Sequence, residues 1–521
     1  MISDRNNRRL WGQTAAASWL LGCLFMVVLG ACGVKRVLLG GVGVSDLAIY
    51  HTAFLNSFKG RLYFSWLHPE GMLLYQHFDP IGLLLLPFYA WLGNAAWPAL
   101  PISMAAAGGL TFPAVARIGR QEGLPPVQAL ILPAILLFNP VLHNAVWYDF
   151  HPVVFALPLL VWGWAFLREG RVFGGSLCWA LAILCKENVP LTVGALGVAL
   201  AVGGKRRVGL TWAGVGLGSF LLIVGWIMPS FREWGQGNIS LARYAWLGQS
   251  AGQIAWTLLS RPVFVAERVF GSLRVWEFLL KLVFPLGCLA LFSPQTLMGV
   301  LPELGILLPS SFSAMQTLKF HYPIVLSAVL IIASARGLAW LVRPERNSQE
   351  EPTPQPMAVR LRRPLAVCLC ALAALASLRI LYTDGRSLPF LKNPVERRYY
   401  EPESRKGTIH AMADLIPTTA SLSLPLNLVN PIYPFAERPL IAFLPERSEL
   451  ADYVIFDAQK RFFGGHMDPG FDEALERFRH SGEHEIAFSR DGFLVFQRRQ
   501  PLINDPELKR EQWARGGRFA R

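Results

Sequence analysis

Long apolar runs separated by short polar turns are the main pattern along the first 383 residues. The first run, 15–33, follows Arg5, Arg8 and Arg9 and is close to the roughly 20 residues that a helix needs to cross a bilayer. Further candidate spans lie at 98–116, 126–143, 152–167, 172–186, 189–204, 208–229, 278–293, 295–310, 322–342 and 365–383. The pattern predicts an α-helical polytopic membrane protein with about 11 or 12 transmembrane helices.

The polar turns predict how these spans are oriented. A cleaved signal peptide would also begin with arginines and an apolar run, but a chain that returns to the membrane many times is expected to keep 15–33 as its first span. Arg168, Arg171 and the cluster 205–207 then fall on the cytoplasmic side with the N-terminus and the linker 343–363. The long loops 34–79 and 230–276 and the C-terminal part face outside.

One stretch does not fit a simple alternation of spans. Arg117 and Arg120 also favour the cytoplasm, which requires an odd number of crossings between Asp79 and Arg117. That stretch is too short for three crossings. Either 80–97 or 98–116 is therefore expected to be a half-span or an interfacial helix, or the positive-inside rule fails locally.

Residues 384–521 have a different composition. They carry 20 basic and 20 acidic residues, so the whole formal charge of +14 lies in residues 1–383. A charged connector (384–407) precedes a predicted small α/β extracytoplasmic domain (408–500) and a flexible basic tail (501–521). The expected helices of the α/β domain are 408–416 and 471–480, and its expected strands are 421–428, 439–443, 453–456, 485–489 and 492–497. Arg490-Asp491-Gly492 is typical of the tight turn of a hairpin.

Composition excludes several other classes of protein. Hydrophobic residues make up 53% and charged residues 16%, whereas soluble domains carry about 25% charged residues. Disorder, a coiled coil and a nucleic-acid-binding protein built from basic soluble modules do not fit these values. The seven cysteines all lie in apolar segments and show no disulfide framework or zinc spacing.

Ionisable residues near membrane depth are costly, so they are candidates for function. Asp46, Asp79, Asp149 and Glu187 come from distant parts of the chain, yet the predicted topology places all four at the outer ends of spans. Asp46 is either a helix N-cap after a glycine-rich turn or a general base. Asp79 and Asp149 precede prolines, so capping of the next span is a serious alternative for both.

The histidines near these carboxylates widen the choice. His77-x-Asp79 and Asp149-x-His151 would supply two imidazoles and two carboxylates to one divalent cation. Lys186 and Glu187 form either an interfacial ion pair or part of a phosphate site. His321 and Tyr322 belong either to an interfacial aromatic belt or to a site for a lipid head group.

These motifs together resemble a known family. Asp46-Leu47-Ala48-Ile49-Tyr50, His77-Phe78-Asp79-Pro80, Tyr148-Asp149-Phe150-His151-Pro152, Lys186-Glu187-Asn188 and His321-Tyr322 occur with Ala451-Asp452-Tyr453-Val454-Ile455-Phe456-Asp457 and Ser489-Arg490-Asp491-Gly492-Phe493. They resemble the uncharacterised bacterial membrane proteins of domain of unknown function 2079, over about residues 40–498. That family is similar in plan to the C-type membrane glycosyltransferases.

The resemblance implies a fold and a reaction. It implies a multi-pass protein of the bacterial inner membrane that transfers a sugar from a polyprenyl-phosphate donor to an extracytoplasmic acceptor. Asp46 would be the base. Substrate or phosphate would bind at Tyr50, Lys186, Glu187, His321 and Tyr322, and a divalent cation at His77, Asp79, Asp149 and His151. A transporter or flippase of a lipid-linked sugar, and a non-catalytic membrane protein, remain the alternatives.

Overall fold

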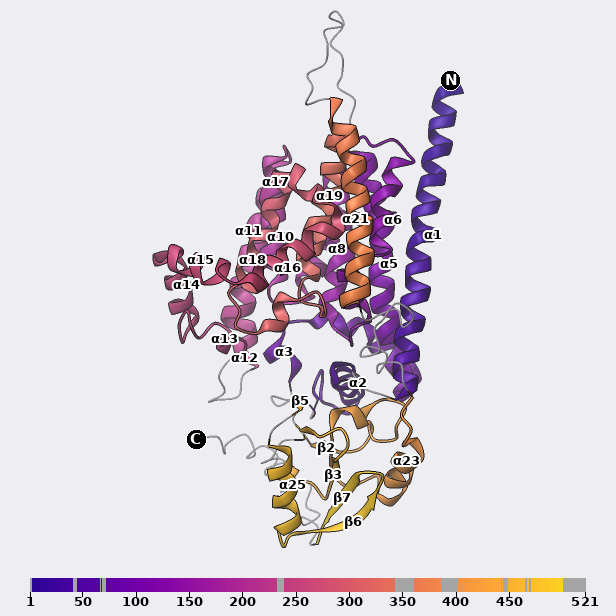
Figure 1. Cartoon of the computed structure of the whole chain (residues 1–521), viewed down its shortest axis with the longest axis vertical. Coiled ribbons are helices and arrows are strands. Elements are labelled where there is room, and N and C mark those ends of the chain that lie inside the picture. The colour runs from indigo at the N-terminus through magenta and orange to yellow at the C-terminus, as the bar shows by residue number, and fades with distance from the viewer. Residues whose placement is uncertain are drawn as a thin grey trace, which may run out of the picture.

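A bundle of apolar helices stands on a small α/β region in the computed structural model (Figure 1). The structure describes residues 2–40, 45–65, 67, 72–231, 239–342, 360–385, 402–441, 443, 448–463, 466–467 and 470–499. The predicted tail 501–521 and most of the connector 384–407 and the linker 343–363 lie outside the described residues. Among these residues, six helices are long and apolar enough to cross a membrane, and a seventh span results if one bent pair is counted as one.

The spans are built from the following elements. The long helices are α1 (Ile2–Leu39), α5 (Ala99–Gln121), α8 (Ala156–Glu169, extended by the turn η4, Pro152–Phe155), α11 (Arg206–Leu222, continued through η5, Ile223–Ile227, and α12, Met228–Ser230), α19 (Ile324–Val342) and α21 (Arg362–Asp384). The bent pair joins η3 (Gln128–Leu130) and α6 (Ile131–Leu136) to α7 (Pro140–Trp147) at 47°. Shorter apolar helices are α9 (Val172–Ile183) and α10 (Val189–Val202).

The number of full-length helices is lower than the 11 or 12 predicted. The expected spans 278–293 and 295–310 are present as short pieces instead of continuous helices. These pieces are α16 (Leu273–Val283), η6 (Phe284–Leu286), η7 (Leu289–Phe292), α17 (Pro294–Leu297), η8 (Met298–Val300) and α18 (Leu301–Leu307). Pro285 and Pro294 remove backbone donors, and Gly287 has a left-handed φ of 61°. Hydropathy detects apolar runs but not these breaks.

The predicted irregularity before Arg117 is confirmed. Residues 80–96 form short pieces, η1 (Pro80–Leu85), α4 (Leu86–Leu92) and η2 (Gly93–Ala96), whereas α5 is a continuous helix of 23 residues. α1 packs closely along α5, because a Cβ at Gly22 would lie 2.4 Å from the carbonyl oxygen of Gly109. Small residues at such a crossing let two helices approach closely.

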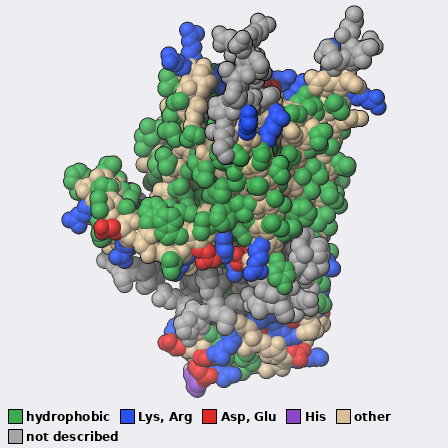
Figure 2. All heavy atoms as spheres, turned by 45° about the horizontal axis from the view of Figure 1, so that its top comes forward, with side chains coloured by type: hydrophobic (Ala, Val, Ile, Leu, Met, Phe, Trp, Pro, Cys, Tyr) green, Lys and Arg blue, Asp and Glu red, His purple; other side chains and the backbone are tan. Residues whose placement is uncertain are grey.

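The arginine-rich turns lie together at one end of the bundle. Arg120 lies over the Trp11 ring at 5.2 Å, and Arg168 donates to the carbonyl of Gly203 at 3.1 Å. Figure 1 places the N-terminus at this end and the C-terminal sheet at the other, and Figure 2 shows a broad band of hydrophobic side chains between them. The cytoplasmic position of the arginine-rich end stays a prediction from the distribution of Lys and Arg.

The C-terminal region contains a five-stranded sheet in the order β2-β1-β3-β7-β6. Its strands are β1 (Leu422–Ser423), β2 (Leu440–Ile441), β3 (Tyr453–Asp457), β6 (His484–Arg490) and β7 (Phe493–Arg498). The predicted hairpin is present: β6 and β7 pair antiparallel across Asp491 and Gly492, which have φ values of 50° and 79°. The predicted helices are α23 (Lys406–Leu415) and α25 (Phe471–His480), and a second pair is formed by β4 (Phe462–Phe463) and β5 (His466–Met467).

The C-terminal region contacts the bundle where α1 ends. The side-chain amide of Asn430 donates to the carbonyl of Val37 at 3.0 Å, and the Tyr433 hydroxyl donates to that of Gly40 at 3.2 Å. α2 (Ser45–Ser57) lies between the bundle and the sheet in Figure 1. The other short elements are α3 (Leu73–Gln76), α13 (Ile239–Ala242), α14 (Ala251–Ser260), α15 (Pro262–Phe270), η9 (Ser313–Gln316) and η12 (Leu426–Val429).

Candidate functional site

The first turn of α2 is held by a carboxylate from a distant part of the chain. Asp149 accepts hydrogen bonds from the backbone N–H groups of Asp46 at 2.7 Å and Leu47 at 2.8 Å. Such N–H groups have no partner within their own helix, so an oxygen here stabilises the start of α2. The expectation that Asp149 caps the next span is therefore wrong, because its carboxylate accepts from the N–H groups of α2 and not from those of the span that follows it. Asp79, likewise, makes no side-chain capping bond to η1.

A buried arginine lies beside Asp149. The Arg36 guanidinium is 3.7 Å from a carboxylate oxygen of Asp149 and stacks at 4.8 Å from the Trp147 ring. Burial raises the pKa of Asp149 to about 6, while the positive charge of Arg36 opposes the shift. At neutral pH Asp149 is therefore mainly ionised. Its backbone has a φ of 34°, an uncommon conformation for a residue other than glycine, which costs about 1–3 kcal/mol and so needs such support.

The Asp46 carboxylate points to an imidazole. Its Oδ2 lies 3.3 Å from Nε2 of His151, and the Asp46 side chain is 38% exposed while that of His151 is 14% exposed. The His151 ring stacks on the His321 ring with centroids 3.5 Å apart. Tyr148 stacks against both imidazoles. Asp46 is thus the accessible end of a stack that joins three of the sequence motifs.

Positive charge lies on the other side of this stack. The His321 ring is 4.4 Å from the Tyr322 ring, and the Lys186 ammonium lies 5.7 Å from the centre of Tyr322. Burial lowers the pKa of His321, and His151 together with the charges of Lys186 and Arg243 lowers it further. His321 is therefore neutral at physiological pH. The arrangement places a carboxylate and two cations around one pair of imidazoles.

The other predicted residues form a neighbouring group. His77 Nδ1 lies 3.1 Å from Oε1 of Glu187, and the backbone N–H of Phe78 donates to Oε2 of Glu187 at 3.1 Å. The Tyr50 hydroxyl donates to the Asp79 carboxylate. The Tyr50 ring contacts Phe150, between Asp149 and His151, with centroids 5.0 Å apart. The His77–Glu187 pair is joined to the rest only through its neighbours in the sequence, since Lys186 precedes Glu187 and Asp79 lies two positions after His77.

The predicted cation ligands are not grouped as one site. His77 is paired with Glu187, Asp79 with Tyr50, Asp149 with Arg36 and His151 with Asp46. Within the part of the chain that the structure describes, no three His, Cys, Asp or Glu side chains are grouped so as to hold a metal ion. The divalent cation at His77, Asp79, Asp149 and His151 therefore stays a prediction without geometric support.

Two cations of this site, Arg36 and Arg243, were missed by sequence reasoning. Arg36 was counted as part of an outer loop, although Lys35-Arg36 at the outer end of a span is unusual under the positive-inside rule. That exception was the available signal. Arg243 lies among the many aromatic residues of the 230–276 loop, and nothing in that stretch distinguishes it from an interfacial arginine.

The carboxyl group of Asp79 is expected to make folding stability depend on pH. Burial raises its pKa to about 7 from 3.8, so the folded state binds this proton more tightly than the unfolded state. Stability therefore rises as the pH falls through about 7, and the gain is complete below about 3.8. We expect the unfolding temperature of the detergent-solubilised Asp79→Asn variant to rise less than that of the wild type between pH 8 and pH 6.

An exposed carboxylate in the C-terminal region provides the control. Asp472 is exposed on α25, and an Asp472→Asn variant should keep the pH dependence of the wild type. Equal pH dependence in the wild type and in Asp79→Asn would show that Asp79 does not titrate in this range.

Solved structures with a similar course of the chain include ArnT and an archaeal oligosaccharyltransferase. ArnT from Cupriavidus metallidurans in the apo state is 13% identical, with 92% of this chain and 98% of that chain covered and a TM-score of 0.49. The same protein bound to undecaprenyl phosphate is 13% identical, with 91% of this chain and 97% of that chain covered and a TM-score of 0.48. The archaeal oligosaccharyltransferase AglB from Archaeoglobus fulgidus, in complex with an inhibitory peptide and a dolichol-phosphate, is 12% identical. The match covers 93% of this chain and 75% of that chain, with a TM-score of 0.42. This likeness concerns the fold alone.

Sequence comparison assigns the family. No curated protein matches the chain. A family description, "Predicted membrane protein (DUF2079)", matches residues 43–495, a stretch that runs from just before Asp46 to β7 and includes every residue of the candidate site except Arg36. The motifs that the structure brings together around α2 are thus those of a membrane protein of the DUF2079 family, to which this chain belongs.

Proposed function

We propose that this protein is a glycosyltransferase that moves a sugar from a polyprenyl-phosphate donor to an acceptor at the end of the bundle that carries the C-terminal region. The observation that carries the proposal is the Asp46–His151–His321 stack. A half-exposed carboxylate lies 3.3 Å from an imidazole. Lys186 lies 5.7 Å from the Tyr322 ring, and Arg243 lies 5.2 Å from the ring of Phe312, which contacts Tyr322. A base and phosphate-binding cations are what this reaction requires.

Asp46 is assigned the role of general base. Its side chain is the most exposed of the stack, so an acceptor hydroxyl can reach it from outside the bundle. Asp149 holds the backbone N–H of Asp46, and the Asp46 carboxylate lies against the imidazole of His151. His151 is a positioning residue, because its Nε2 faces the Asp46 carboxylate and its ring is held by His321.

Lys186 and Arg243 are assigned to the leaving phosphate. The acceptor oxygen forms a bond to the anomeric carbon, and the bond between that carbon and the phosphate oxygen breaks. The acceptor proton passes to Asp46, and the electron pair stays with the polyprenyl phosphate. Two nearby cations stabilise the negative charge that develops there. A single displacement of this kind inverts the configuration of the anomeric carbon.

The proposal is tested with the purified full-length protein in lipid vesicles. The probes are polyprenyl-phosphate monosaccharides labelled in the sugar, and the readouts are retained donor lipid and released polyprenyl phosphate. We expect the donor lipid to be retained by the protein. We expect the amount of released polyprenyl phosphate to increase when an acceptor-containing envelope extract is added. Retention with sugar crossing the bilayer but no release would favour a lipid-linked sugar flippase instead. No retention of any donor would overturn the donor class.

A further inference from the structure

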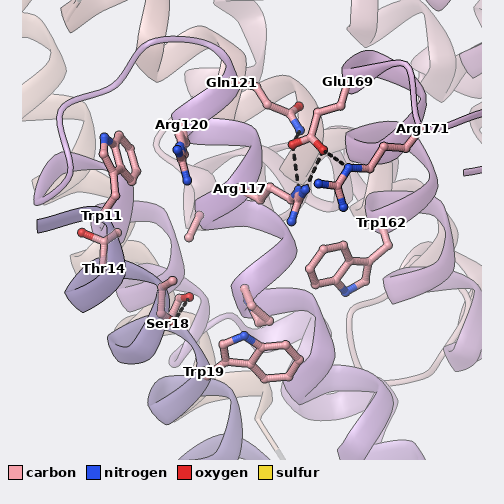
Figure 3. Close-up of a pocket in the computed structure, with 13 residues that line it drawn as sticks. Trp11, Thr14, Ser18, Trp19, Arg117, Arg120, Gln121, Trp162, Glu169 and Arg171 are labelled. Atoms are coloured by element: carbon pink, nitrogen blue, oxygen red, sulfur yellow. Dashed lines mark hydrogen bonds and ion pairs between the residues drawn. The ribbon is translucent and has the colours of Figure 1, made fainter. Parts of the chain in front are cut away.

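A second polar site lies at the opposite end of the bundle from Asp46. A cavity of about 540 Å³ opens between α1, α5 and α8, where these helices reach the arginine-rich end (Figure 3). Its lining residues are Trp11, Thr14, Ala15, Ser18, Trp19, Pro113, Ala116, Arg117, Arg120, Gln121, Trp162, Glu169 and Arg171. The site is remote from the proposed transfer chemistry and does not depend on it.

The cavity has an excess of positive charge. Arg117 forms a two-pronged bond with Glu169, at 2.8 and 2.6 Å, and Arg171 lies 3.2 Å from the same carboxylate. Two guanidinium groups thus contact this carboxylate, and Arg120 is a third in the cavity lining, which leaves two formal positive charges in excess. Arg120 stacks on Trp11 at 5.2 Å, and Figure 3 shows it between Trp11 and Arg117. Guanidinium groups bind phosphate oxygens particularly well.

The surroundings of the cavity are those of a membrane boundary. Trp19 is 46% exposed, the next residue, Leu20, is 70% exposed, and Leu24, five positions after Trp19 on α1, is 53% exposed. Figure 3 shows Trp162 next to Arg117, whose guanidinium lies 5.9 Å from the Trp162 ring, and Trp19 on the side of the cavity away from the guanidinium groups. Tryptophan and arginine at this depth are typical of the zone between lipid head groups and acyl chains. The cavity therefore has a cationic part next to an apolar helix surface.

We infer that this cavity binds the phosphate head group of an anionic membrane phospholipid, with its acyl chains along the exposed face of α1. Charge complementarity selects an anion, and the exposed leucines of α1 select a ligand with an apolar tail. A free phosphate would satisfy the guanidinium groups alone. The two sources of phosphate are therefore distinguished by whether the acyl chains contribute to binding.

The test compares lipids on the full-length protein in detergent by native mass spectrometry. The probes are phosphatidylglycerol, phosphatidylcholine and inorganic phosphate, each titrated separately. We expect phosphatidylglycerol to be retained more tightly than phosphatidylcholine, and inorganic phosphate not to displace it. The Arg120→Gln/Arg171→Gln double variant is expected to bind phosphatidylglycerol at least about tenfold more weakly, because each such cation contributes roughly a factor of five.

The matched control removes two arginines from the same end of the bundle but outside the cavity. Arg206 and Arg207 are exposed at the start of α11, and their replacement by Gln should leave phosphatidylglycerol binding unchanged. Unchanged unfolding temperatures would show that both double variants are folded. Equal losses in the two double variants, or displacement of the lipid by inorganic phosphate, would overturn the inference.

Discussion

Replacing Asp46 by asparagine is expected to abolish sugar transfer while the donor lipid stays bound. Asparagine keeps the shape of the side chain but cannot take the acceptor proton, and a general base contributes about 10²–10⁴-fold to a rate. The cations assigned to the phosphate, Lys186 and Arg243, are unchanged in this variant. We therefore expect release of polyprenyl phosphate to fall by about that factor, with donor retention close to that of the wild type.

The control for this variant is an exposed carboxylate in the C-terminal region. Asp414 on α23 is solvent-exposed, so Asp414→Asn should keep wild-type transfer. Transfer by Asp46→Asn within a factor of about ten of the wild type would show that Asp46 is not the base. Loss of donor retention together with transfer would instead assign Asp46 to donor binding.

Much of the architecture was predictable, because a bilayer requires apolar runs of about 20 residues and a sheet requires short strands separated by turns. The apolar runs indicated α1, α5, α19 and α21, and the Asp491-Gly492 turn indicated the β6–β7 hairpin. The continuity of the spans was not predictable in the same way. A run such as 278–293 is apolar apart from Lys281 and Ser293, but its breaks depend on Pro285, on the left-handed Gly287 and on how neighbouring helices satisfy the backbone.

Which residues form the site was predictable from the sequence, but which of them contact one another was not. The cost of charge near the membrane was enough to select Asp46, Asp149 and the histidines. Which atom contacts which depends on tertiary structure: Asp149 reaches the N–H groups of α2 across about a hundred residues of chain. Local patterns such as Asp149-x-His151 suggested shared cation ligands, whereas alternate residues here face different partners.

Replacing Asp149 by alanine is expected to cause the largest loss of stability among single substitutions at the site. The change removes the acceptor for two N–H groups of α2 and the negative charge beside the buried Arg36. Breaking a buried ion pair from one side costs about 3–5 kcal/mol, and loss of a cap about 1 kcal/mol. The free energy of unfolding in detergent, measured with a chemical denaturant, should therefore fall by about 3 kcal/mol or more.

A more exposed ion pair at the same end of the bundle is the matched control. Asp384 lies 2.7 Å from Lys281, whose side chain is 31% exposed, and Asp384→Ala should cost only about 1 kcal/mol. A similar loss in the two variants would show that the Arg36–Asp149 pair is no more important than a surface pair.

The Asp149→Asn variant separates the two roles of this carboxylate. Asparagine retains one acceptor oxygen and tolerates the positive φ of this position better than alanine does, so its loss should reflect mainly the missing charge. The Arg36→Met/Asp149→Asn double variant also removes the buried guanidinium. If electrostatics dominate, this double variant is more stable than Asp149→Asn alone, because it also removes the buried positive charge that Asp149→Asn leaves unpaired. If capping of α2 dominates, the free energy of unfolding of the double variant is no higher than that of Asp149→Asn.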